Sequence, residues 1–267
     1  TQQSIYMDLL KELNEAQAAL NGASAAAMKS ADNFYQGDAS KWRKFANSLM
    51  LRVAMRMSKV DPAAAEQWVK TAVANGVFES DADNCMLMHA GGLTTNDFSE
   101  PYAKIYSHED RGNFFLTKYF VDLLKSTNDP RLSLIGTVCE EPTISVQAGS
   151  DFQYGNSDPA VQKGLPSGFS DSPDSPWFVG NKYPEFKDED YRSTYRSRYS
   201  TINRYTYSDS TGPTFVCTYA QTQLLLAEAA VRGWVDGSAQ TYYENGVRAA
   251  CGSSHSSPTA RRCIISI

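Results

Sequence analysis

Histidine is the side chain best suited to proton transfer and metal binding near neutral pH, and this chain has three. They are His89, His108 and His255. They lie far apart in segments of loop-like composition, so no two have the spacing of a metal or catalytic motif. The run His108-Glu109-Asp110 offers nitrogen and oxygen donors, but adjacent residues rarely converge on one ion. We therefore predict no metal site.

No catalytic motif stands out either. The sequence contains no G-x-S-x-G, G-x-G-x-x-G, G-x-x-x-x-G-K-S/T or H-E-x-x-H pattern. Its 30 acidic residues make a pair of glycosidase carboxylates arithmetically possible, yet no spacing identifies one. We predict that the protein is not an enzyme, has no catalytic residue and needs no cofactor. The Asp-rich loops could take a calcium ion, but no spacing indicates one.

The cysteines are odd in number and scattered, and no C-x-x-C occurs, so neither a zinc site nor a disulfide framework is indicated. We expect free thiols that pack as small hydrophobic side chains. The five are Cys85, Cys139, Cys217, Cys251 and Cys263.

One segment, residues 135–212, carries a positive signal for binding. It is dense in Gly, Pro, Ser and Asp and lacks helical periodicity, yet it is rich in the aromatic residues that disordered chains lack. Flat aromatic faces complement the apolar faces of sugar rings, and neighbouring polar groups can bond hydroxyls. Trp177 and Tyr183, each beside a proline, are the first predicted ligand contacts, and Phe178 and Tyr154 complete the set. The alternative is that these aromatic residues form the core of the segment itself.

The composition is that of a globular protein, with 42% hydrophobic and 21% charged residues. A net charge of −5 without a basic face argues against a nucleic-acid partner. No apolar run approaches the roughly 20 residues that span a bilayer. The chain starts TQQSIY, without Met or a signal peptide, so we interpret it as a mature or trimmed soluble chain without targeting information.

The most legible helix is GDASKWRKFANSLMLRVAMRMS, residues 37–58. Apolar side chains recur there every three or four residues and form one stripe, which we expect to be buried and to include Trp42 and Phe45. At about 100° per residue, Arg56 falls inside this stripe and Arg52 falls at its edge. Because a buried guanidinium needs a partner, we predict a carboxylate or backbone carbonyl bonded to Arg56.

Start and stop signals bound the other helices. Asp38 and Asp61 are suited to N-caps, Pro62 to a first helical position, and Gly76 to a helix end. The helical segments that we predict besides residues 37–58 are 5–20, 61–76, 116–125, 213–233 and 238–250.

The last two of these segments have the spacing of a tetratricopeptide hairpin. Ala227 is followed twelve residues later by Ala239, and Tyr243 and Gly246 come next, so small residues and an aromatic lie where two helices would cross. We predict a mainly α fold of tetratricopeptide-like helical hairpins with a loop-rich subdomain containing a few short strands. The predicted parts are a helical scaffold (1–134), the loop-rich, aromatic-rich ligand-binding part (135–212) and a returning hairpin with an atypical tail (213–267).

Several separated segments together resemble one family. GDASKWRKFANSLMLRVAMRMS, NDPRLSLIG and TFVCTYAQTQLLLAEAAVRGW occur in that order, and VQKGLPSGFSD and RYSTINRYTY lie between the second and third. In this order and spacing they resemble the SusD/RagB outer-membrane lipoproteins, in particular the SusD-like branch. The resemblance covers residues 34–250.

This resemblance implies a cell-surface nutrient-binding lipoprotein of the outer membrane. Such proteins are not enzymes. They capture oligosaccharides, and sometimes peptides, for a SusC-like TonB-dependent transporter, and their variable loop-rich part holds the ligand. Membrane association would occur only through an N-terminal lipid anchor, which this chain lacks. The matching segments correspond to scaffold, so the resemblance assigns no ligand contact.

Both ends depart from the family. The signal and lipidated cysteine are missing, family chains are longer, and the tail after Ala250 has no helical period, so we expect the chain to be incomplete at both ends. The leading hypothesis is therefore glycan capture. The alternatives are a tetratricopeptide-like scaffold that binds a protein or peptide and, less favoured, a glycoside hydrolase.

Overall fold

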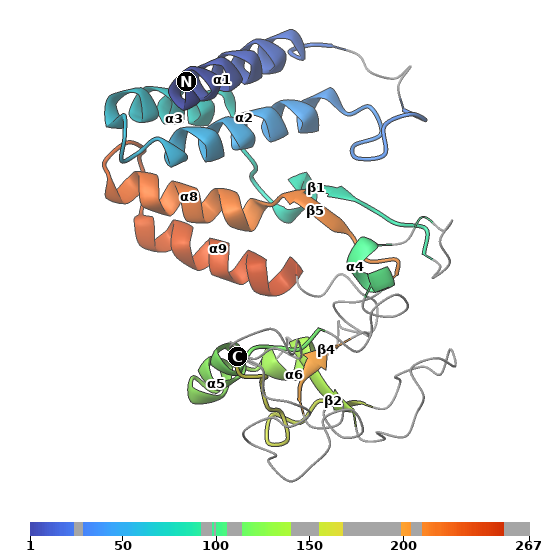
Figure 1. The fold of residues 1–267 in the computed structure, drawn as a ribbon. Coiled ribbons are helices and arrows are strands. Elements are labelled where there is room, and N and C mark those ends of the chain that lie inside the picture. The colour runs from blue at the N-terminus through green and yellow to red at the C-terminus, as the bar shows by residue number, and fades with distance from the viewer. Residues whose placement is uncertain are drawn as a thin grey trace. The chain divides into compact units, whose positions relative to one another are not determined.

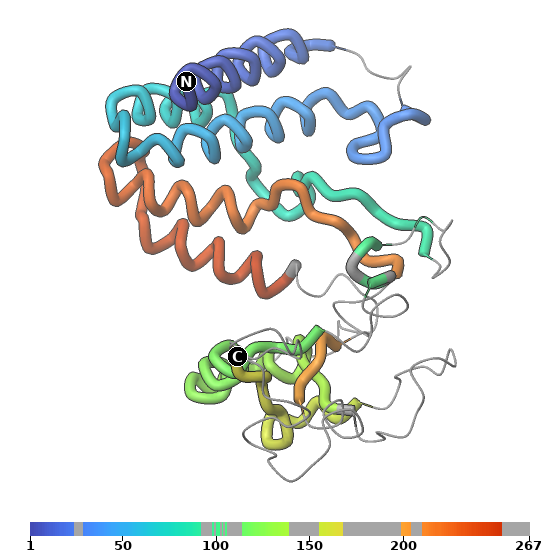
Figure 2. The backbone as a smooth tube through the Cα atoms, viewed as in Figure 1, coloured from blue at the N-terminus to red at the C-terminus, as the bar shows by residue number. Residues whose placement is uncertain are grey.

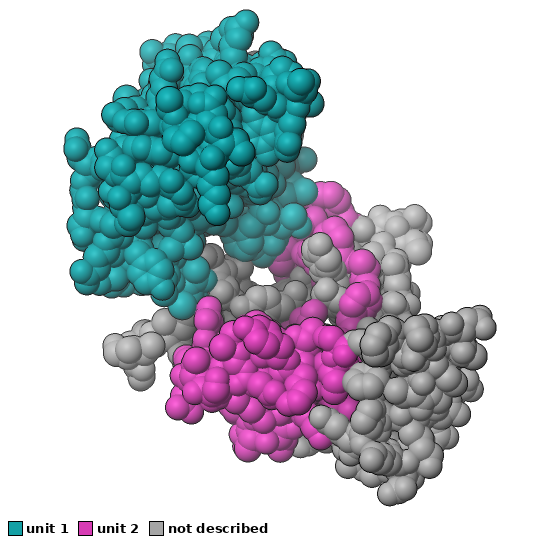
Figure 3. Space-filling view, turned by 60° about the vertical axis from the view of Figure 1, so that its left-hand side comes forward, with its two compact units in different colours: residues 1–88, 213–256 teal, residues 89–212, 257–267 magenta. Residues whose placement is uncertain are grey.

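The computed structural model describes residues 1–23, 29–91, 98, 100–105, 114–139, 155–167, 199–203 and 210–253. These residues form two compact units (Figure 3), unit 1 within residues 1–88 and 213–253 and unit 2 within residues 89–212. Both units combine helices with short strands, and the predicted mainly α class is confirmed.

Unit 1 is a set of helices beside a two-stranded ribbon (Figure 1). Its helices are α1 (Gln2–Ala19), α2 (Ala39–Arg56), α3 (Pro62–Asn75), η2 (Asp81–Asp83, a 3-10 turn), α8 (Tyr219–Val231) and α9 (Ala239–Ser253). Its strands are β1 (Cys85–Leu87) and β5 (Thr214–Cys217), which pair antiparallel. Although 126 residues separate these strands in the sequence, the chain trace shows them side by side (Figure 2).

Helix α2 is the centre of unit 1, because it packs against α1, α3 and α8. The core at these contacts is aliphatic, with Leu51, Ala54 and Val69 completely buried. Burial of such side chains is the dominant favourable term in folding, at about 1.5–3 kcal/mol for each large one. Helices α1, α2, α3 and α8 therefore share one hydrophobic core.

The predicted helix boundaries have a local cause that the structure shows. The Asp38 carboxylate accepts hydrogen bonds from Ser40 N and Lys41 N at the start of α2. Asp61 caps α3, and Gly76 ends it with a φ of 92°, a conformation that favours glycine. The predicted caps are confirmed.

The buried face of α2 differs from the predicted one. Its fully buried positions include the polar residues Asn47 and Ser48, whereas Trp42 and Phe45 are only half-buried. Asn47 Nδ2 donates to the Asn75 and Gly76 carbonyls at 3.2 and 2.9 Å, and Ser48 Oγ accepts from Phe78 N at 2.9 Å. Hydropathy alone assigned the wrong buried face to α2. It counts Asn47 and Ser48 as polar, whereas both can be buried because backbone groups satisfy their hydrogen bonds.

The prediction for Arg56 is wrong for the same reason, since this side chain lies on the exposed side of α2. The guanidinium that acquires partners is that of Arg52, at the edge of the predicted stripe. Its Nη1 donates to the Val216 carbonyl at 3.2 Å and to Gln221 Oε1 at 3.3 Å. Arg52 thereby ties α2 to β5 and α8.

Helices α8 and α9 form the predicted hairpin, but α8 starts at Tyr219 and not at residue 213. The first residues of the predicted helix, Thr214–Cys217, are strand β5 because they pair with β1. Ala227 is buried and Ala239 half-buried, but Tyr243 is 58% exposed, so its predicted place at the helix crossing is wrong. The aromatic that packs against the core is its neighbour Tyr242, whose hydroxyl donates to the Asp236 carbonyl at 3.0 Å. Gly246 lies at the crossing, against the side chain of Leu224.

Unit 2 contains small helices and a three-stranded sheet of order β3-β2-β4. Its elements are α4 (Pro101–Lys104), α5 (Lys118–Ser126), α6 (Leu132–Ile135), β2 (Gly136–Cys139), β3 (Gly155–Asn156) and β4 (Thr201–Ile202). The buried amide of Gln162 donates to the carbonyls of Leu132, Gly136 and Ser157 at 3.0–3.1 Å. It thereby joins α6, β2 and the segment after β3.

The first division between the two units lies at a different point from the predicted one. We placed the end of the scaffold at residue 134, whereas the units divide after Met88. The reason is packing: α5 and α6 share the core of Leu116, Val121 and Leu132 with the β2-β4 side of unit 2. The second division, between Gly212 and Pro213, lies where we placed it.

Candidate functional site

The four predicted ligand contacts, Tyr154, Trp177, Phe178 and Tyr183, lie outside the described residues. They stay predictions. The structure does describe how the segment that carries them is joined to unit 1. Of the histidines, it describes His89, whose ring packs 5.0 Å from that of Phe98 in unit 2.

The ribbon of β1 and β5 is the foot from which this segment departs. Leu87, at the end of β1, is paired with Thr214, at the start of β5, and Met86 is paired with Phe215. In an antiparallel pair these residues are direct neighbours. The intervening residues 88–213 therefore leave the ribbon and return to it at one point, as an insertion between paired strands.

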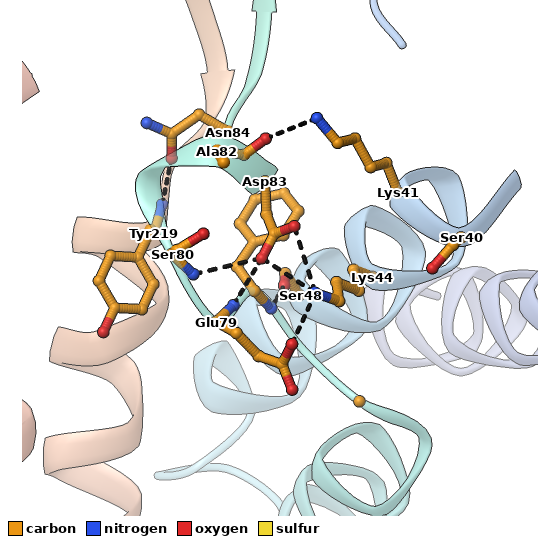
Figure 4. Close-up of polar contacts among 12 residues, drawn as sticks. Ser40, Lys41, Lys44, Ser48, Glu79, Ser80, Ala82, Asp83, Asn84 and Tyr219 are labelled. Atoms are coloured by element: carbon orange, nitrogen blue, oxygen red, sulfur yellow. Dashed lines mark hydrogen bonds and ion pairs between the residues drawn. The ribbon is translucent and has the colours of Figure 1, made fainter. Parts of the chain in front are cut away.

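A charged cluster fixes the turn just before β1 (Figure 4). The Asp83 carboxylate is almost fully buried and accepts hydrogen bonds from Glu79 N at 2.9 Å and Ser80 N at 3.2 Å. Lys44 of α2 donates to Glu79 Oε2 at 2.6 Å and to both Asp83 oxygens at 3.2 Å. The bond to Glu79, followed by the contact with Asp83, raises the pKa of Lys44. Three donors therefore converge on Asp83, and this cluster holds the backbone of the turn.

Two more bonds attach the same turn to its neighbours (Figure 4). Asn84 Oδ1 accepts from Tyr219 N at 2.6 Å, at the start of α8, and Lys41 Nζ donates to the Ala82 carbonyl at 2.9 Å. Thr218 caps α8 through Gln221 N. Both strands of the foot are thus held to helices, which makes it a rigid base for the insertion.

An aromatic group lies beside the foot. The Trp42 ring makes edge contacts with Phe34, Tyr35 and Phe45, with centroids 5.9, 5.2 and 5.7 Å away. Its Nε1 donates to Asp32 Oδ2 at 2.8 Å. The predicted structural role of Trp42 and Phe45 is therefore seen as a satellite cluster rather than as part of the main core.

The Asp32 carboxylate organises the turn that precedes α2. Burial on its own would raise its pKa, but hydrogen bonds from Gly37 N, Trp42 Nε1 and the amides of Phe34 and Tyr35 outweigh that effect and lower the pKa to about 2. The Tyr35 hydroxyl in turn donates to the Asp83 carbonyl at 2.8 Å. This turn and the foot are therefore directly bonded.

A cavity of 340 Å³ opens at the other end of α2, lined by residues of α1, α2 and the start of α3. Arg56 lines it, together with the amides of Gln2 and Gln3 and the phenol of Tyr6. A cation, two amides, a phenol and the carboxylate of Asp61, which also lines the cavity, can bond a small polar molecule.

Two further observations concern the part of the chain that the structure describes. No three or more of its His, Cys, Asp and Glu side chains are arranged so that they could hold a metal ion. None of its helices is both long enough and apolar enough to cross a membrane.

Sequence reasoning missed the residues that build the foot. Ser80 and Asp83 have the Ser-x-x-Asp spacing of a capping box, which could have indicated a short helical turn before β1. Asp32 precedes the turn NFYQGD, and an Asp there commonly bonds the following amides. The partner of Asp83, Lys44, carries no such signal because it lies 39 residues away.

Comparisons with known proteins give one consistent result. A family model named SusD-like, described as "Starch-binding associating with outer membrane", matches residues 1–258. A solved structure of a chitin-binding protein is 31% identical, with a TM-score of 0.68, over 95% of this chain and 49% of that one. A chitin-binding SusD homolog from Flavobacterium johnsoniae is 25% identical, with a TM-score of 0.69, over 95% of this chain and 45% of that one.

A Bacteroidetes SusD-like structure, at 24% identity, shares the fold with a TM-score of 0.75 over 96% of this chain and 55% of its own. The chain thus spans about half the length of the solved structures that it matches. No protein with a curated description matches it. Because the family model covers nearly the whole chain, and the fold of helical, tetratricopeptide-like hairpins agrees with it, the chain belongs to the SusD-like family.

Proposed function

We propose that the protein is a non-catalytic binding protein that captures a nutrient oligosaccharide at the cell surface. The observation that carries this proposal is the match of residues 1–258 to a family described as starch-binding. The 31% identity to a chitin-binding protein supports a glycan ligand and favours chitin-derived oligosaccharides as the first to test.

The topology supports the same function. Residues 88–213 form an insertion whose two ends are paired at the foot, and binding residues commonly lie on loops that a rigid scaffold positions. This insertion contains Trp177, Phe178, Tyr183 and Tyr154, whose rings suit the faces of sugars. Stacking and a few hydroxyl bonds compete with well-hydrated sugars, so we expect modest affinity.

The family's description also supports a proposal about what happens to the bound oligosaccharide. The family's description includes association with the outer membrane, so we propose that the bound oligosaccharide passes to a SusC-like TonB-dependent transporter. We further propose that the whole protein is a lipoprotein held at that membrane by an N-terminal lipid anchor.

Calorimetric titration with chito- and malto-oligosaccharides tests the proposal. We expect binding by the parent chain and at least a tenfold loss of affinity for Trp177→Ala and Tyr183→Ala, which corresponds to about 1.4 kcal/mol. Tyr119→Ala is the matched control, because Tyr119 is 79% exposed on α5 and is not among the predicted contacts.

Two outcomes would contradict the proposal. Tight binding of peptides without binding of any glycan would favour the peptide-binding scaffold. Release of shorter sugars during prolonged incubation, detected by chromatography, would show a glycoside hydrolase.

A further inference from the structure

Two buried cysteines face each other at the foot of the insertion. Cys85 of β1 and Cys217 of β5 are cross-strand partners in the antiparallel register. Both side chains are almost fully buried, in the cluster that also contains Tyr35 and Phe78, and both are free thiols in the structure. No sequence pattern pairs them, since they lie 132 residues apart and no C-x-x-C or even count of cysteines indicates a framework.

The strand register brings them within disulfide reach. Residues directly opposite in an antiparallel pair have Cα atoms about 4.5 to 5.5 Å apart. A disulfide requires Cα atoms about 4.4 to 6.8 Å apart, so the pairing of these two residues is compatible with one. The register shifts immediately after Cys85, which leaves this pair at the end of the regular ladder, where the strands can adjust.

The surroundings of the two sulfurs can accommodate the bond. Cys217 Sγ donates a weak hydrogen bond to Gln221 Oε1, 3.8 Å away, and the Cys85 thiol is hydrogen-bonded to Tyr35; oxidation changes these two interactions. Gln221 Oε1 still accepts its hydrogen bond from Arg52 at 3.3 Å, and the Tyr35 hydroxyl still donates to the Asp83 carbonyl at 2.8 Å. No buried polar group among these loses its last partner.

We propose that Cys85 and Cys217 form a disulfide that closes the foot of the insertion in the exported protein. The family is described as associating with the outer membrane, and disulfides form and persist in the periplasm and at cell surfaces. The bond would link the two parts of unit 1, residues 1–88 and 213–253, covalently. This inference is independent of which ligand the insertion binds.

The oxidant is a second disulfide, either of a small molecule or of an oxidoreductase. One cysteine loses its proton, and its thiolate attacks the oxidant, forming a mixed disulfide and releasing one thiol. The second cysteine, also deprotonated, attacks the chain's sulfur in that mixed disulfide, forms the Cys85–Cys217 bond and releases the second thiol. Two electrons pass to the oxidant, whose two sulfurs take up the two protons.

The reaction should be slow in the folded chain and faster during folding. Burial raises the pKa of Cys217 to about 11 and also raises that of Cys85, so little thiolate is present near neutral pH. The bond is therefore expected to form before the foot closes completely or when it opens.

Refolding the full chain from denaturant in a mixture of oxidised and reduced glutathione tests the proposal. Each of the five cysteines falls on a different tryptic peptide, so alkylation, digestion and mass spectrometry identify any pairing. We expect peptide 71–104 linked to peptide 205–232, a fall from five to three free thiols, and a higher unfolding midpoint that dithiothreitol reverses.

Variants separate this pair from other pairings. Cys251→Ser should leave the linked peptides unchanged, whereas Cys85→Ser and Cys217→Ala should each abolish the link and the shift in midpoint. The proposal is overturned if the refolded parent chain keeps Cys85 and Cys217 open to alkylation, or links either one mainly to another cysteine. This readout on the parent chain decides the question even if a variant fails to fold.

Discussion

At the residue scale, a carboxylate that accepts several hydrogen bonds stabilises this fold more than the surface ion pairs do. Asp32 accepts three backbone amides and the Trp42 indole, so one side chain sets both the turn before α2 and the orientation of an aromatic ring. Exposed pairs such as Lys70–Glu66, by contrast, contribute about 0–1 kcal/mol. Bonds from several donors to one ionised acceptor are stronger and fix more backbone.

This arrangement predicts a specific pH dependence. The pKa of Asp32 falls from 3.8 to about 2 on folding, so its contribution to stability is full above about pH 4 and is lost as the pH falls toward 2. We expect Asp32→Asn to lower the free energy of unfolding by about 1 kcal/mol at pH 7, a value discounted for partial exposure, and the difference from the parent chain to shrink below pH 4.

Urea unfolding followed by tryptophan fluorescence at several pH values between 7 and about 3 measures this difference. Asp8→Asn is the control, because Asp8 is an exposed carboxylate on α1. A destabilisation by Asp32→Asn that is the same at every pH would show that the carboxylate's charge is not what holds the turn.

At the element scale, close contact between α8 and α9 decides how the hairpin packs. A Cβ built on Gly246 would lie 2.8 Å from Leu224 Cγ and 3.2 Å from the Ala220 carbonyl oxygen. The leucine side chain can move, but the helix backbone cannot move without shifting α8. The helices therefore approach this closely only because position 246 lacks a side chain.

We expect Gly246→Ala to lower the free energy of unfolding by about 1–2 kcal/mol, because overpacking outweighs the better helix propensity of alanine. Gly252→Ala in the same helix is the matched control, since a Cβ at that position would meet nothing within 4 Å, and it should be neutral or stabilise by up to about 1 kcal/mol. Thermal unfolding followed by circular dichroism compares the two. Equal effects of both substitutions would contradict the close crossing.

At the scale of the whole molecule, unit 1 is assembled from two distant parts of the chain. Helices α2 and α8 share its core, and β1 pairs with β5, so neither part has a complete core without the other. The insertion starts and ends at one paired position, which makes the scaffold separable from it in principle.

A shortened chain tests that separation. Because Leu87 pairs with Thr214, residues 88–213 can be replaced by Asn-Gly, a turn suited to a two-residue hairpin. We expect a helical protein with one cooperative unfolding transition by circular dichroism. A chain that stays helical but unfolds without a cooperative transition would mean that the insertion is needed to complete the core.

The sequence by itself determined the mainly α class, the positions of most helices, their caps at Asp38 and Asp61, and the family resemblance. It did not indicate strand β5, whose residues 214–217 were predicted as helix. The helices and their caps are decided locally: a capping side chain and the two or three amides that it bonds lie within a few residues of each other. The ordered spacing of the scaffold segments is also a property of the linear chain, and the family model confirms what it indicated.

The tertiary structure alone decided which side of each helix is buried and which distant residues meet. Arg52 rather than Arg56 has partners, and Tyr242 rather than Tyr243 packs inward, because the positions of the neighbouring helices decide burial, not the helix's own periodicity. The pairing of Cys85 with Cys217 depends on the register of two strands separated by the whole insertion. No local pattern encodes that register, which exists only after α2 has brought α8 and β5 alongside it.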